Sequence, residues 1–135
     1  MTELDQAIAA AYGSEGKQDD VNKVYLTLLR STLFLPVRKD QDSLDDEPFR
    51  PLFTVINEEY FMLAFDTLDR LIAWAGDQMD KIAYVELSGR DLVAGINEKV
   101  YLCVNLDTQY YKEFSPDEVF QLKKIVARLD QLKGA

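Results

Sequence analysis

The chain has 135 residues, with an apolar share of 47% and an aromatic share of 11%, which is enough to build the core of one domain. Its formal net charge of −9 disfavours binding to nucleic acid or to an anionic membrane, because both require a positive surface. The single cysteine cannot form a disulfide within the chain, and the absence of histidine excludes Ser-His and Cys-His catalysis and imidazole metal ligands. We therefore expect a cytoplasmic protein without a cofactor.

A short amphipathic helix is predicted at the start of the chain, over residues 3–12. Its apolar side chains recur at helical spacing, at Leu4, Ile8, Ala11 and Tyr12. Gly13–Gly16 then forms a flexible joint. Because this helix has few apolar anchors, we expect it to be mobile or to dock on a partner or on a second copy of the chain. Residues 1–16 are therefore separated from a single domain over residues 17–135.

A second helix and a strand near a sheet edge are predicted next. The core-facing stripe of the helix consists of Val21, Val24, Tyr25, Leu28 and Leu29. Residues 31–37 form a β-branched and aromatic run that contains Pro36, which cannot donate to a ladder. The acidic run Asp40–Glu47 lacks the Gly and Glu of an EF-hand in register, so a solvated loop is favoured over a calcium site.

Strands and helices alternate in the middle of the chain. The runs 51–56 and 60–65 predict an antiparallel hairpin. A helix after Asp66 and a short helix capped by Ser88 then separate three nearly apolar strands, at residues 60–65, 82–87 and 100–104. This order is typical of parallel strands joined by right-handed crossovers.

The clearest helix is the last one, because Ser115-Pro116-Asp117-Glu118 is a complete capping box with Pro at the first helical position. Together the elements predict an α+β fold. We expect a mixed sheet of about five strands with a parallel β-α-β-α-β central part, an antiparallel hairpin, and packed N- and C-terminal helices.

Polar side chains follow each of the three central strands, at the edge where open α/β sheets bind ligands. They are Asp66, Asp69, Ser88, Gly89, Arg90, Asp91, Asn105 and Asp107. Their oxygens suit a hard cation such as magnesium, and Ser88-Gly89-Arg90 could hold a phosphate, although Asp91 would repel it. Asp, Ser and Asn are also the usual cap residues, so helix capping is the favoured explanation.

The aromatic residues Trp74, Tyr110 and Tyr111 are candidates for contact with a partner protein. Cys103 lies inside an apolar run and has no neighbouring base in the sequence, so we expect it to be buried and inert.

Several segments resemble the SseB N-terminal domain family over roughly residues 25–130. They are Pro51-Leu52-Phe53-Thr54, the strand at 61–65, Leu71, Trp74-Ala75, the segment 85–92, Val104-Asn105 and 115–118. The most specific part is Glu86-Leu87-Ser88-Gly89-Arg90-Asp91-Leu92. The resemblance implies an α+β bacterial domain of undefined biochemistry, without a catalytic motif. The family's common Asn-Pro-Gly is Asn105-Leu106-Asp107 in this chain.

The functional expectation is a non-enzymatic protein-interaction or scaffold domain, which binds a protein partner or a second copy of itself. It rests on a well-specified fold that carries no nucleophile–base pair and no phosphate loop. The alternative is a protein that binds a small ligand or a divalent metal at the strand ends, through Asp66, Asp91, Asn105 and Asp107.

Overall fold

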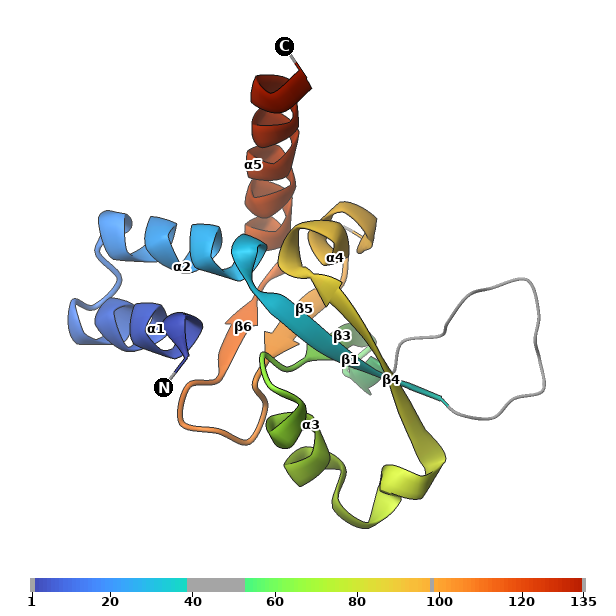
Figure 1. Cartoon of the computed structure of the whole chain (residues 1–135). Helices are drawn as coiled ribbons and strands as arrows, with labels where there is room; N and C mark the ends of the chain where they lie inside the picture. The colour runs from blue at the N-terminus through green and yellow to red at the C-terminus, as the bar shows by residue number, and fades with distance from the viewer. Residues whose placement is uncertain (1, 39–52, 98, 135) are drawn as a thin grey trace.

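The computed structural model describes residues 2–38, 53–97 and 99–134, and the acidic run Asp40–Glu47 lies outside these ranges. Figure 1 shows the arrangement of the elements. In chain order they are α1 (Glu3–Gly13), α2 (Gln18–Arg30), β1 (Thr32–Arg38), β2 (Phe53–Ile56), β3 (Glu59–Ala64), α3 (Leu68–Ala75), the 3-10 helix η2 (Gly76–Lys81), β4 (Ile82–Ser88), α4 (Gly89–Gly95), β5 (Tyr101–Val104), β6 (Lys112–Phe114) and α5 (Pro116–Gly134).

The described strands form two sheets. One sheet pairs β1 antiparallel with β4, and the other has the order β2-β3-β5-β6. In the second sheet β3 is parallel to β5, and the remaining pairs are antiparallel. Phe34 and Phe65 join the two sheets through backbone N–H···O bonds of 2.7 and 3.0 Å. The predicted α+β class and the β2–β3 hairpin are confirmed.

β4, which was predicted as the middle strand of the parallel unit, lies in the two-stranded sheet. β3 and β5 are parallel neighbours, with Leu63 opposite Cys103. β4 does not join them and pairs antiparallel with β1 instead, so the β-α-β-α-β part is reduced to one parallel pair. Tyr84 and Glu86 are exposed along β4. A central parallel strand is covered on both faces, whereas one face of β4 remains open to solvent.

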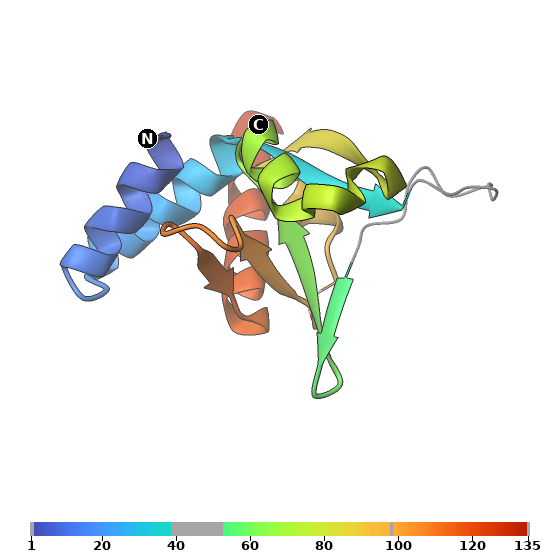
Figure 2. The same cartoon turned by 90° about the horizontal axis from the view of Figure 1, so that it is seen from below.

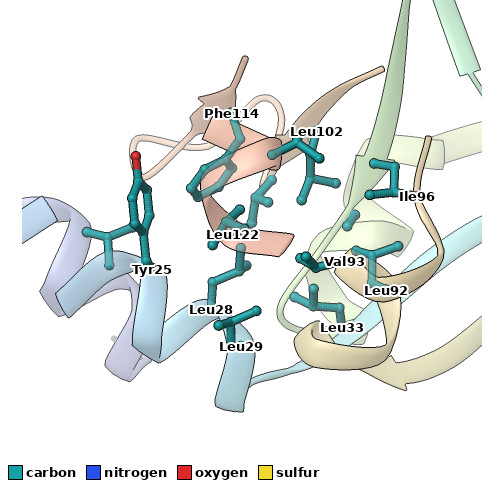
Figure 3. Packing of buried hydrophobic residues seen from close by; sticks show 14 of the residues in the cluster. Tyr25, Leu28, Leu29, Leu33, Leu92, Val93, Ile96, Leu102, Phe114 and Leu122 are labelled. Atoms are coloured by element: carbon teal, nitrogen blue, oxygen red, sulfur yellow. The ribbon is translucent and has the colours of Figure 1, made fainter. Parts of the chain in front are cut away.

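The main core lies between the helices α1, α2, α4 and α5 and one face of the four-stranded sheet. Figure 3 shows side chains from these helices, from this sheet and from β1 pointing toward one another, among them Leu28, Leu33, Val93, Leu102, Phe114 and Leu122. All six are fully buried. A second cluster on the other face of the sheet contains Leu63, Phe65, Leu71 and Cys103, with Trp74 packed against it.

The N-terminal helix α1 belongs to the main core. Leu4 and Ile8 are each 1% exposed and Ala7 is 2% exposed. Thr2 caps the helix through a reciprocal capping box with Asp5. The expected shortage of anchors is therefore not observed, because the apolar residues of one face pack against α2 and hold α1 within the chain itself.

The last helix begins at the predicted capping box. The Glu118 N–H donates to Ser115 Oγ at 3.3 Å, and the Ser115 N–H donates to Glu118 Oε1 at 3.2 Å. Val119, Leu122 and Val126 bury the first turns of α5, whereas Leu132 near its end is 72% exposed. The C-terminal part of α5 accordingly extends beyond α2 and α4 (Figure 1).

Candidate functional site

The structure brings together two of the predicted strand-end residues, Asp66 and Asn105. The Asp66 N–H donates to Asn105 Oδ1 at 3.0 Å. Asn105 is fully buried and has a φ of 61°, a left-handed conformation that Asn adopts more readily than most residues. Its Nδ2 has no hydrogen-bond partner among the described residues. The end of β3 is thus fixed to the loop that follows β5.

Arg70 extends this contact into a polar cluster of five residues, Thr2, Asp5, Asp66, Arg70 and Asn105. The Arg70 guanidinium donates to Asp66 Oδ1 at 2.7 Å and to both oxygens of Asp5 at 2.8 and 2.7 Å. Thr2 Oγ1 donates to Asp66 Oδ2 at 2.6 Å. The polar cluster therefore joins the start of α1 to α3 and to the end of β3.

Asp5 is the most deeply buried charge of the polar cluster, with 0% of its surface exposed. Burial alone raises the pKa of Asp5, but the hydrogen bonds from Arg70 and from the Thr2 backbone outweigh it, so the pKa lies below the ordinary value of 3.8. The carboxylate is accordingly ionised and paired in the folded protein.

The contacts of the polar cluster stabilise the packing of α1, α3 and the end of β3. Both carboxylates already accept hydrogen bonds from the Arg70 guanidinium, whose single positive charge balances one of their two negative charges. Within residues 2–38, 53–97 and 99–134, no group of three or more Asp, Glu or Cys side chains could hold a metal ion. Of the strand-end oxygens that suggested a magnesium ligand set, those of Asp66 and Asn105 are thus used in contacts within the chain.

Ser88 and Asp91 are located at the predicted helix cap. The Asp91 N–H donates to Ser88 Oγ at 3.1 Å, and the Asp91 side chain is exposed. In the part of the chain that the structure describes, no hydrogen bond or ion pair links Asp91 to Asp66 or Asn105. Arg90 forms an ion pair with Asp130, which ties α4 to α5.

Gly89 is required by the packing of α2 against α4. A Cβ atom at this position would lie 1.9 Å from the backbone oxygen of Leu28, and the Gly89 N–H donates to the Ser31 oxygen at 2.8 Å. Only a residue without a side chain permits this approach. The Ser-Gly-Arg sequence therefore has a structural explanation that involves no phosphate.

Two further predicted residues, Asp107 and Trp74, do not belong to the polar cluster. Asp107 is exposed and has a φ of 68°, so it keeps a left-handed conformation where the family pattern has Gly. Trp74 packs on Phe65 with ring centroids 5.6 Å apart and belongs to the second core cluster.

Reasoning from the sequence missed three members of the polar cluster, Thr2, Asp5 and Arg70. The Thr2-Asp5 spacing fits an N-cap followed by an acid at N3, and this signal could have located the cap. No pattern in the sequence links Asp5 to Arg70, because the two residues come from separate helices.

A groove of about 200 Å³ lies between α1, α2 and the β6–α5 junction. Its lining is mainly apolar and includes Ile8, Ala11, Tyr12, Val21, Val24 and Tyr25. At its polar side Glu118 accepts hydrogen bonds from the Tyr25 hydroxyl at 2.9 Å and from Lys112 Nζ at 3.1 Å. No pattern in the sequence predicted this groove, since its walls come from distant segments.

The tip of the β2–β3 hairpin exposes three large apolar side chains, which we call the hairpin patch: Val55 (56% exposed), Ile56 (52%) and Tyr60 (52%). Asn57 and Glu58 form the turn with φ values of 51° and 69°, as a tight type I′ connection requires. Figure 2 shows that this turn projects beyond the helices.

Comparison with known proteins gives the family. The model of the SseB protein N-terminal domain family matches residues 4–121, which is most of the chain, so the chain belongs to this family. The matched region includes α1. No curated protein and no solved structure matched the chain. Among the described residues, no helix is both long and apolar enough to cross a membrane.

Proposed function

We propose that the chain is a non-enzymatic protein-interaction domain of the bacterial cytoplasm, and that the hairpin patch contacts the partner. The observation that carries this proposal is the exposure of Val55, Ile56 and Tyr60, each more than half exposed, on one projecting turn. Val55 and Tyr60 lie opposite each other on one side of the hairpin, and Ile56 lies on the other side, opposite Glu59. Exposed apolar side chains gathered at a projecting tip are typical of interaction sites.

The position of β2 supports this role. β2 is the outer strand of the four-stranded sheet, and no strand among the described residues pairs with its outer edge. An outer strand can accept an extended segment of another chain through backbone hydrogen bonds, while side chains such as Val55 add apolar contact.

The chemistry of Cys103 fits a non-enzymatic role. Burial raises the pKa of the Cys103 thiol, and the charge of the nearby Glu113 raises it further. A hydrogen bond with Tyr111 lowers this pKa but does not outweigh the other two effects. A buried thiol that resists ionisation is a poor nucleophile.

The proposal is tested with the triple variant Val55→Thr/Ile56→Thr/Tyr60→Thr, since threonine retains strand propensity but removes most of the apolar surface. Crosslinked partners recovered from bacterial lysate, and self-association measured by light scattering, should both be compared with the wild type. We expect at least a fivefold loss of the specific complex.

The matched control is Leu26→Gln, which removes an apolar side chain 43% exposed on α2. Unchanged complexes in the triple variant would refute the hairpin patch as the contact surface.

The groove between α1 and α2 favours a second candidate function, the binding of a small apolar ligand. Ala11 lines the groove and Ala10 is exposed on the same helix, so Ala11→Leu should fill the groove whereas Ala10→Leu should not. A thermal shift caused by a panel of small apolar compounds should then disappear in the first variant alone. If no compound shifts the wild type, this candidate is discarded.

A further inference from the structure

The sheet face beside the hairpin patch combines aromatic rings with carboxylates. The strand registers place Phe61 of β3 opposite Tyr101 of β5, and Glu113 of β6 opposite Cys103 of β5. Glu59 lies on the same face, because its carboxylate accepts a hydrogen bond from the Tyr101 hydroxyl at 3.0 Å. We call the set Glu59, Phe61, Tyr101, Tyr111 and Glu113 the acidic–aromatic face.

Its aromatic and acidic groups hold one another in place. The rings of Phe61 and Tyr101 are stacked, with centroids 4.5 Å apart and an interplanar angle of 27°. The Tyr111 hydroxyl donates to Glu113 at 2.9 Å. Glu59 and Glu113 are both exposed, and the three rings are half-buried. Two carboxylates are therefore presented to solvent on β3 and β6, with the Tyr101 ring of β5 between those strands.

Negative charge on this face is not balanced by the strands themselves. Among the described residues of the four strands, the basic side chain is Lys112, which lies over the Phe114 ring at 5.0 Å and pairs with Glu118 on the opposite face. The hydrogen bond to Glu59 raises the pKa of Tyr101, and the charges of Glu113 and Asp117 act in the same direction. The phenol thus lies in a negative field to which three carboxylates contribute.

We propose that the acidic–aromatic face binds a basic segment of the partner protein, with an Arg or Lys side chain on an outer face of the stacked Phe61–Tyr101 pair and within reach of Glu59 and Glu113. Aromatic faces attract cations, and carboxylates bind guanidinium and ammonium groups through charge-assisted hydrogen bonds. The net charge of −9 adds long-range attraction for such a segment. This inference rests on the proposed interaction function and names the chemistry of the partner.

The test uses the full chain and a capped peptide of alternating arginine and valine, compared with a peptide of alternating glutamate and valine. Binding is measured by calorimetry and located by NMR amide shifts. We expect binding of the arginine peptide alone, with the largest shifts at Phe61 and Tyr101 and affinity that falls as salt rises. Glu59→Gln/Glu113→Gln should weaken binding at least about fivefold.

The matched control is Asp69→Asn/Asp77→Asn, which removes the same amount of charge at two exposed acids outside the sheet. An equal loss in both double variants, or equal binding of the glutamate peptide, would overturn the inference. Tyr101→Leu removes a ring without changing the charge, and it should also weaken binding of the arginine peptide. If the wild type captures a partner through the hairpin patch but does not bind the arginine peptide, the inference fails and the proposed function stands. If the triple hairpin variant captures partners as the wild type does, the proposed function fails.

Discussion

Gly89 lies where the C-terminal end of α2 comes closest to the start of α4. Its N–H donates to the Ser31 oxygen, and the Leu28 oxygen occupies the space that a Cβ would need. Ser88 caps α4 beside it, and Arg90 holds the same helix to α5. Neighbouring residues that together resembled a ligand-binding turn thus each make a separate packing or capping contact.

Replacing Gly89 by alanine should destabilise the protein by about 3 kcal/mol or more, because backbone atoms of α2 would have to move. Urea unfolding monitored by circular dichroism measures the loss. The control is Gly95→Ala at the end of the same helix, where a Cβ meets no atom within 4 Å. That change should alter stability by less than about 1 kcal/mol, in the stabilising direction. Equal effects at both positions would contradict the packing explanation.

At the scale of elements, α1 and α5 show opposite ways of using an amphipathic helix. α1 is short, yet Leu4, Ala7 and Ile8 are almost fully buried against α2. α5 is long, and its buried contribution to the core, through Val119, Leu122 and Val126, does not extend to its last turn, where Leu132 is 72% exposed. The sequence of α5 carries the stronger helix signals of the two. Length and capping predict that a helix forms, but they do not predict how much of its surface the rest of the chain covers.

Ile8→Ala should therefore lower the free energy of unfolding by about 2–5 kcal/mol, the usual cost of a large-to-small change in a core. Leu132→Ala on α5 should change it by less than about 0.5 kcal/mol, because that side chain is 72% exposed. The midpoint of urea unfolding measures both. A small effect of Ile8→Ala would show that α1 is dispensable for folding.

At the scale of the whole molecule, the polar cluster fastens elements that are far apart in the sequence. Arg70 on α3 pairs with Asp5 on α1 and with Asp66 after β3, and Asn105 fixes the loop after β5 to the same point. Asp5 has no exposed surface. Removing one partner of a buried pair leaves a charge without compensation, so the cluster acts as a unit.

Stability should depend on pH through Asp5. The pKa of Asp5 in the folded protein is lower than its ordinary value of 3.8, so its contribution is fully present above that value and is lost as the pH falls through the folded pKa. Urea midpoints measured from about pH 7 to about pH 3 should decline only at the acidic end. Asp5→Asn should be less stable at about pH 7 and decline less on acidification. An identical decline in the variant would exclude Asp5 as a source.

Local structure and family membership could be predicted from the amino-acid sequence. The capping box at Ser115, the β2–β3 hairpin and the cap at Ser88 were all predicted, because each depends on residues close together in the chain. The α+β class follows from the same local patterns, and the family match over residues 4–121 agrees with the resemblance.

The way these elements meet could not be predicted, because it depends on contacts between residues far apart in the chain. β4 pairs with β1 and not with β3 or β5, although its apolar run resembles theirs. Asp5 reaches Arg70 across separate helices, and the acidic–aromatic face is assembled from three strands and the residue that precedes β6. The physical reason is that hydrophobic periodicity specifies which side of an element is buried, whereas strand partners and ion pairs depend on contacts between distant residues that leave no periodic pattern in the sequence.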